Sequence, residues 1–248
     1  MASFVWWRHP QEAYDNPYEY GAQQQFSREA KGLLLQLRVG LNCFTMKYHK
    51  NDHSLEKATW MLAVDLNDTL LEILCLFEEK RHSTGFRLFR DIVETMDLLY
   101  VLHFSTPRAE KTLKKWYENS TIPHKDSRMY IQEIEGAEAA EKRSKYYSEL
   151  SKFTHRTYLS LLNSYSLGKN NMLVNDSYSQ NNGLILPQTI ASGLAVLADL
   201  ILQVTQCLIR CGALSSEVVE NAWLLAIEDQ IIPRRFSSIK SHDSYSSK

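Results

Sequence analysis

Apolar residues recur along much of the chain at the spacing of an α-helix. No Gly or Pro interrupts residues 41–84 or residues 137–167, and such stretches accommodate long helices but few hairpins. The pattern predicts an all-α protein, a single-domain helical bundle of about six to eight helices. The spacing of three, four or seven is clearest at Trp60, Val64, Leu71, Leu74 and Phe77.

Short polar segments separate the predicted helices. Residues 51–54 (Asn-Asp-His-Ser) supply a turn and a helix cap. The looser segment 120–136 has room for one more short helix, and the Asn-rich segment 166–187 is expected to be a long loop. The helices themselves are predicted at residues 27–50, 55–80, 84–104, 107–119, 137–165, 188–211 and 214–231.

The chain divides into three regions in this interpretation. Residues 1–24 form an aromatic-rich N-terminal arm, and a role in docking a protein partner is one option for it, since Trp, Tyr and Arg dominate binding hot spots. Residues 25–235 form the bundle, with the long loop at 166–187. Residues 236–248 are rich in Ser and Lys and are predicted to be disordered.

Composition narrows the class of protein. Only 9 Gly and 6 Pro stand among 248 residues, so turns are few. The formal net charge of -1 argues against a polybasic nucleic-acid binder, although a local basic patch remains compatible with it. The N-terminus lacks a basic segment followed by an apolar run, and the 4 Cys are scattered, so we expect a cytoplasmic protein.

Residues 190–209 are apolar enough to suggest a membrane span. They contain Asp199, Gln203 and Gln206, which a spanning helix rarely carries. We therefore expect a buried helix here and no membrane partner.

A polar stripe marks the predicted helix 84–104. Arg87, Arg90, Asp91 and Glu94 fall within a strip about 100° wide, so Arg87 can reach Asp91 and Arg90 can reach Glu94. Beyond Glu94 the helix becomes apolar all round, which indicates burial. Three interpretations follow: a solvated face, a structural ion network, or a site where the Arg side chains hold an anion such as phosphate.

A second candidate lies on the predicted helix 137–165. His155 stands at the border of the apolar stripe that includes Tyr147, and Ser151 lies one turn before it, where it could orient the ring. His155 is either a residue of the core edge, a general acid or base, or a metal ligand. No nucleotide-binding, hydrolase or metalloprotease motif is present, and no cofactor is expected.

These two helices resemble a family of uncharacterised bacterial all-helical proteins. The first motif is Phe86-Arg87-x-x-Arg90-x-x-x-Glu94, and the second is Tyr147-x-x-Leu150-Ser151-x-x-x-His155. The resemblance extends over about residues 55–165. By analogy it is also similar to the HEPN superfamily, whose members often act as metal-independent ribonucleases in toxin–antitoxin and phage-defence systems.

The HEPN signature places an Arg a few residues before a His. Here Arg87 and Arg90 lie on an earlier helix than His155, so the set would be assembled in space. The resemblance implies RNA as partner, no metal, and catalytic roles for Arg87, Arg90, Glu94 and His155, with Tyr147 and Ser151 in support. The alternative is a non-catalytic protein–protein interaction module, in which the same residues form a structural network. A homodimer is plausible in either case.

Overall fold

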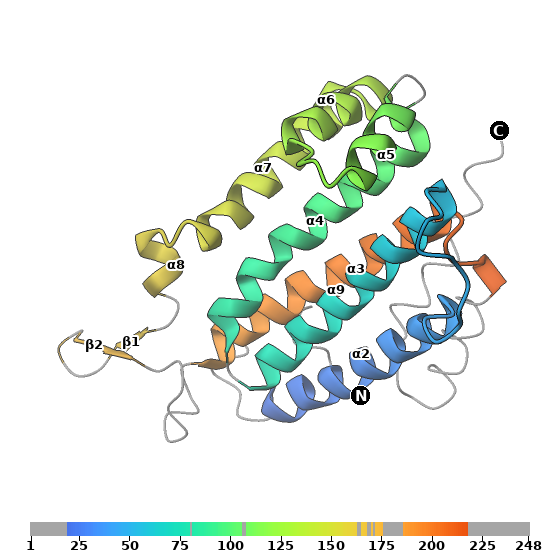
Figure 1. Cartoon of the computed structure of the whole chain (residues 1–248). Helices are drawn as coiled ribbons and strands as arrows, with labels where there is room; N and C mark the ends of the chain where they lie inside the picture. The colour runs from blue at the N-terminus through green and yellow to red at the C-terminus, as the bar shows by residue number, and fades with distance from the viewer. Residues whose placement is uncertain are drawn as a thin grey trace, which may run out of the picture.

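Helices make up most of the residues that this computed structural model describes, which are 19–79, 81–105, 108–162, 165–167, 170, 172–175 and 186–217 (Figure 1). The helices are α2 (Glu19–Gly40), α3 (Leu55–Glu78), α4 (His82–Phe104), α5 (Ala109–Tyr117), α6 (His124–Glu135), α7 (Ala137–Thr154), α8 (Tyr158–Leu162) and α9 (Leu186–Arg210). Two short strands, β1 (Tyr165–Leu167) and β2 (Leu173–Asn175), pair antiparallel. The described part of the chain thus holds 8 helices, and the prediction of an all-α helical bundle is confirmed.

Helix α4 lies at the centre of the bundle. It packs against α3 and α9 on one side and against α6 and α7 on another (Figure 1). Phe89, Ile92 and Leu99 on α4 are completely buried, as the apolar run predicted. Because so many neighbours share this helix, its polar residues are held between several packed elements.

The apolar segment 190–209 forms most of helix α9. Its Leu197, Leu200 and Ile201 are buried against α2, α3 and α4, whereas Asp199 is exposed. The expectation of a helix that belongs to the core is confirmed. No helix among the described residues has the length and apolar content that a membrane crossing requires.

The turn predicted at residues 51–54 caps helix α3. The Ser54 hydroxyl accepts a hydrogen bond from the Lys57 backbone N–H at 3.2 Å, and Asp52 Oδ1 accepts one from the Ser54 N–H at 2.8 Å. Side-chain oxygens thereby satisfy backbone donors that have no partner within the helix.

Two predicted helices were too long. The helix predicted at 27–50 ends at Gly40, and the backbone turns at Asn42, whose φ is 53°. The helix predicted at 137–165 ends at Thr154, because Arg156 adopts a φ of 52° that a right-handed helix does not allow. Both breaks rest on left-handed backbone at residues that the hydrophobic pattern does not distinguish.

The remaining predictions hold in part. The short helices predicted after residue 107 and within 120–136 are α5 and α6. The arm predicted at 1–24 is helical from Glu19 onward, and part of the loop predicted at 166–187 is the pair of short strands. Residues 1–18 and 218–248, with most of the predicted helix 214–231 and the tail, lie outside the described residues.

Two glycines that face the same aromatic ring provide a test of core packing. A methyl group at Gly193 would overlap the buried Phe77 ring, whereas one at Gly85 would lie 3.5 Å from it, at ordinary contact distance. We expect Gly193→Ala to lower the free energy of unfolding by about 1–3 kcal/mol through overpacking. Gly85→Ala should raise it by up to about 1 kcal/mol, because Ala favours a helix.

Urea denaturation of both variants measures the difference. Equal stability of the two variants would contradict this packing of α9 against Phe77.

Candidate functional site

Helices α4 and α7 run antiparallel, and three contacts fix their register. Asp97 on α4 bonds to Arg143 on α7, Glu94 bonds to Tyr147, and Phe86 stacks on Phe153 with ring centroids 4.6 Å apart. As residue numbers fall along α4 they rise along α7. The sequence alone left open whether these two helices pack together, and the structure brings them into contact.

The predicted residues Arg90, Glu94 and Tyr147 meet in one cluster. Arg90 Nε donates to Glu94 Oε1 at 2.8 Å, and the Tyr147 hydroxyl donates to the same oxygen at 2.6 Å. The Arg90 guanidinium also lies 5.0 Å from the centre of the Tyr147 ring. Burial raises the pKa of the Glu94 carboxyl, but the bonds from Tyr147 and Arg90 outweigh it and lower that pKa overall.

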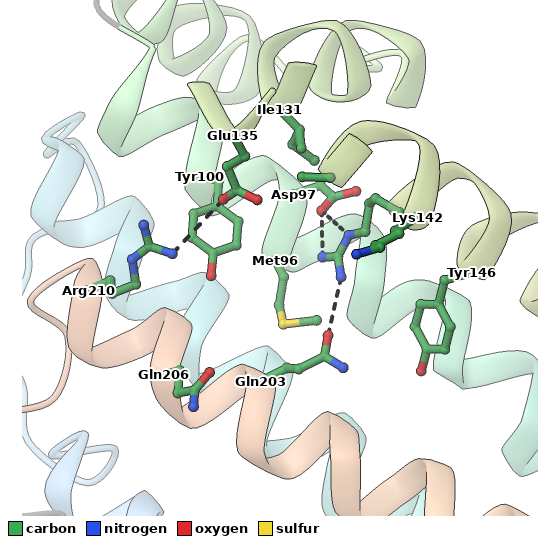
Figure 2. A pocket seen from close by; sticks show the side chains of 12 residues that line it. Met96, Asp97, Tyr100, Ile131, Glu135, Lys142, Tyr146, Gln203, Gln206 and Arg210 are labelled. Carbon is green, nitrogen blue, oxygen red and sulfur yellow. Dashed lines mark hydrogen bonds and ion pairs between the residues drawn. The ribbon is translucent and has the colours of Figure 1, made fainter. Parts of the chain in front are cut away.

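A second cluster surrounds Asp97, whose side chain is 0% exposed. Arg143 donates to Asp97 Oδ1 from Nη2 at 2.6 Å and from Nε at 2.8 Å, and its Nη1 donates to Gln203 at 3.3 Å (Figure 2). The other carboxylate oxygen of Asp97 lies 2.7 Å from His124 Nε2. A buried carboxylate needs such partners, because an unpaired charge in the core costs on the order of several kcal/mol.

The His124 ring joins the two clusters. It stacks on the Tyr147 ring at a centroid distance of 4.1 Å and an angle of 16°. The result is one continuous group of polar side chains from four helices, which we call the interhelical network. Its members are Arg90, Glu94, Asp97, His124, Arg143, Tyr147 and Gln203.

Three predicted site residues lie outside this network. The structure shows no ion pair between Arg87 and Asp91, so that predicted pair is wrong, whereas the pair of Arg90 with Glu94 is confirmed. Ser151 donates its hydroxyl hydrogen to the Tyr147 carbonyl at 2.8 Å, so it does not orient the imidazole of His155. His155 is the exposed C-cap of α7, and no side-chain hydrogen bond joins it to the described residues.

Cavities lie on both sides of the network. One, of about 390 Å³, is lined by Asp97, Arg143 and Gln203 together with Lys142 and Arg210 (Figure 2). The other, of about 250 Å³, is lined by Glu94 and His124 together with Trp116 of α5. No group of three or more His, Cys, Asp or Glu within the described ranges is arranged to hold a metal ion.

Sequence reasoning missed Asp97, His124 and Arg143. Asp97 carried a signal, because an acidic residue within the apolar run 92–102 must be paired if the helix is buried there. His124 carried none, since it follows Pro123 in a segment of no clear pattern. Arg143 stands among several charged residues at the start of α7, and only the packing distinguishes it from them.

No family model, curated protein or solved structure matches the chain. The class of the protein is therefore described from its fold and from the interhelical network alone. It is an all-α helical bundle protein with a partly buried polar network between its helices.

The buried Asp97 should dominate the stability of the network. Asp97→Ala leaves the Arg143 guanidinium, which is 16% exposed, without its carboxylate. We expect the free energy of unfolding to fall by about 3–5 kcal/mol, the cost of breaking a buried ion pair on one side. Glu138→Ala, which removes an 83%-exposed carboxylate paired with Lys142, is the matched control and should leave stability unchanged.

Urea denaturation at neutral pH compares the two variants. If both variants lost the same free energy of unfolding, the ion pair of Asp97 with Arg143 would contribute no more than an exposed ion pair.

The lowered pKa of Glu94 predicts a pH dependence. Its stabilising effect is complete above the unfolded value of about 4.5 and is lost as the pH falls through the lower folded value. Glu94→Gln keeps an acceptor oxygen for Arg90 and Tyr147 but cannot titrate. We expect the variant to lose less stability than the parent between about pH 5 and pH 3. If the free energies of unfolding of the variant and the parent fell by the same amount over this pH range, the lowered pKa of Glu94 would be contradicted.

Proposed function

We propose that the protein is a HEPN-like helical effector that cleaves RNA without a metal. His155 serves as general acid or base, and Arg87 holds the phosphate. The observation that carries the proposal is the register of α4 and α7. Phe86 stacks on Phe153, so Arg87 beside the first ring and His155 shortly after the second belong to the same end of the helix pair.

The register can be expressed as a distance along the helices. Position 153 lies level with position 86 and the helices are antiparallel, so His155 is level with about position 84. Arg87 is three residues from that level, which is about 4.5 Å of helical rise. Arg87 is partly exposed and its side chain has no ion pair or hydrogen bond among the described residues, so its guanidinium is available to an anion. His155 is exposed as well.

The remaining predicted residues take positioning roles in this proposal. Glu94 and Tyr147 bind Arg90 and fix α4 against α7, and Ser151 bonds to its own helix. His155 would take the proton of a ribose 2′-hydroxyl, whose oxygen attacks the adjacent phosphorus. The bond to the 5′-oxygen breaks, and that oxygen takes up a proton from the imidazolium, leaving a cyclic phosphate. Arg87 would stabilise the charge that grows on the phosphate.

The test is RNA cleavage, with growth toxicity on expression as a second readout. We expect His155→Ala to abolish both and Arg87→Ala to reduce cleavage about 100-fold or more, as loss of a group that stabilises the transition state does. Both side chains lie at the surface, so the melting temperature should stay nearly unchanged. Lys111→Ala removes an exposed cation of α5 and is the matched control, expected to retain activity.

Full activity of His155→Ala would overturn the catalytic assignment. Cleavage should also weaken as salt rises, because phosphate contacts release counterions. The chain has a net charge of -1, so RNA contact would depend on a few local cations. Cleavage that did not depend on salt would show that Arg87 and His155 do not contact the phosphate.

The second candidate function is a non-catalytic protein–protein interaction module. It is favoured by the observation that the polar groups of Arg90, Glu94 and Tyr147 are bonded to one another. In this case no RNA is cleaved by the parent protein, and the partner binds elsewhere. The predicted docking arm at residues 1–24 lies largely outside the described residues. A homodimer is compatible with both proposed functions.

A further inference from the structure

Two cysteines stand one helical turn apart where helix α9 ends. Cys207 lies within the helix, and Cys211 directly follows its last residue, Arg210. The backbone N–H of Cys211 donates to the Cys207 carbonyl oxygen at 2.9 Å, so the turn between them is helical. Residues four apart on a helix lie on the same face. Both are free thiols, and the proposed RNA cleavage uses neither of them.

The two thiols differ in their access to solvent. Cys207 is 0% exposed, whereas Cys211 is 7% exposed and lines a cavity of about 370 Å³. Asn42 and Lys47 line the same cavity and are exposed, so a small solute reaches the cavity from the surface. Cys207 is not among the residues of this cavity. A small reagent therefore meets Cys211 first.

The surroundings of the two thiols also divide their chemistry. A hydrogen bond from Cys207 lowers the pKa of the Cys211 thiol, and the charge of Arg210 lowers it further, against the opposing effect of burial. The same hydrogen bond, together with burial, raises the pKa of Cys207. The thiolate is the nucleophilic form of cysteine. Cys211 is thus the nucleophile of the pair, and Cys207 keeps its proton.

The backbone allows the two sulfur atoms to bond. Cα atoms four residues apart on an α-helix are about 6 Å apart, within the range of about 4.4–6.8 Å that disulfides span. Gly212, with a φ of 71°, ends the helix directly after Cys211, and Ala213 N–H donates to the Leu208 carbonyl oxygen at 2.8 Å. Closing the bond therefore moves the end of α9 and leaves the rest of the helix in place.

We propose that Cys211 is a site of oxidation by hydroperoxides and that Cys207 converts the oxidised form to a disulfide. The Cys211 thiolate attacks hydrogen peroxide, so an S–O bond forms, the O–O bond breaks and the leaving hydroxide becomes water. The Cys207 sulfur then attacks the sulfenic sulfur of Cys211. The S–S bond forms, the S–O bond breaks, and the departing hydroxide takes the Cys207 proton. In total, two thiols are oxidised and one peroxide is reduced to two waters.

The test maps the disulfide in the full chain. The reduced protein is treated with hydrogen peroxide, its remaining thiols are blocked with iodoacetamide, and it is digested with trypsin. Cleavage after Arg210 places the two cysteines in separate peptides, 170–210 and 211–234. We expect a linked pair from monomeric protein whose mass is the sum of these peptides less two hydrogen atoms. Dithiothreitol should separate the pair, because a disulfide within one helical turn is strained and easily reduced.

Two variants separate the roles of the cysteines. In Cys207→Ser, the oxidation should stop at the sulfenic acid, which dimedone traps on peptide 211–234. In Cys211→Ser, peptide 170–210 should carry no dimedone, because Cys207 is completely buried. Circular dichroism checks that both variants are folded. The double variant Cys43→Ser/Cys75→Ser is the matched control and should form the linked pair as the parent does.

The parent protein alone can overturn the proposal, even if a variant does not fold. Absence of the linked pair after peroxide treatment would do so, as would a disulfide to Cys43 or Cys75, or a linkage found only between two chains. Dimedone on peptide 170–210 of Cys211→Ser would contradict the assignment of Cys211 as the nucleophile. None of these readouts involves RNA, so this site and the proposed ribonuclease activity succeed or fail separately.

Discussion

The carboxylate of Asp97, buried at the centre of helix α4, is the constraint on which the surrounding structure depends. A charge without contact to water must be matched by donors at short range. Arg143 of α7 and His124 of α6 supply these donors, and Gln203 of α9 supports Arg143. These bonds hold three helices at fixed positions against α4. Apolar packing alone would specify those positions less sharply.

The network also separates two chemically different cavities. Asp97 and Arg143 face one that includes the cations of Lys142 and Arg210, and Glu94 and His124 face one that includes Asp91. Charged side chains of both signs line the first cavity, since Glu135 lies there as well, whereas the lining of the second has carboxylates and no Lys or Arg.

The proposed RNA site depends on the network without belonging to it. Bonds between Arg90, Glu94 and Tyr147 fix the register of α4 against α7, and this register determines which residues share the exposed end. Arg87 and His155 are exposed or partly exposed there, and the side chain of neither has a hydrogen-bond partner in the described part of the chain. The internal pairing of Arg90 fits a positioning role better than direct contact with phosphate.

The fold class, the helix cores and the cap at Ser54 could be predicted from the amino-acid sequence, because these depend on periodicity and on contacts within a few residues. The sequence also placed Arg90 and Glu94 as an ion pair, since both stand on one face of one helix. The meeting of Asp97, His124 and Arg143 depends on how the helices pack, because the three residues come from three helices and no local pattern encodes their register. The end of α7 at His155 could not be predicted either, because hydrophobic periodicity does not reveal the left-handed backbone at Arg156.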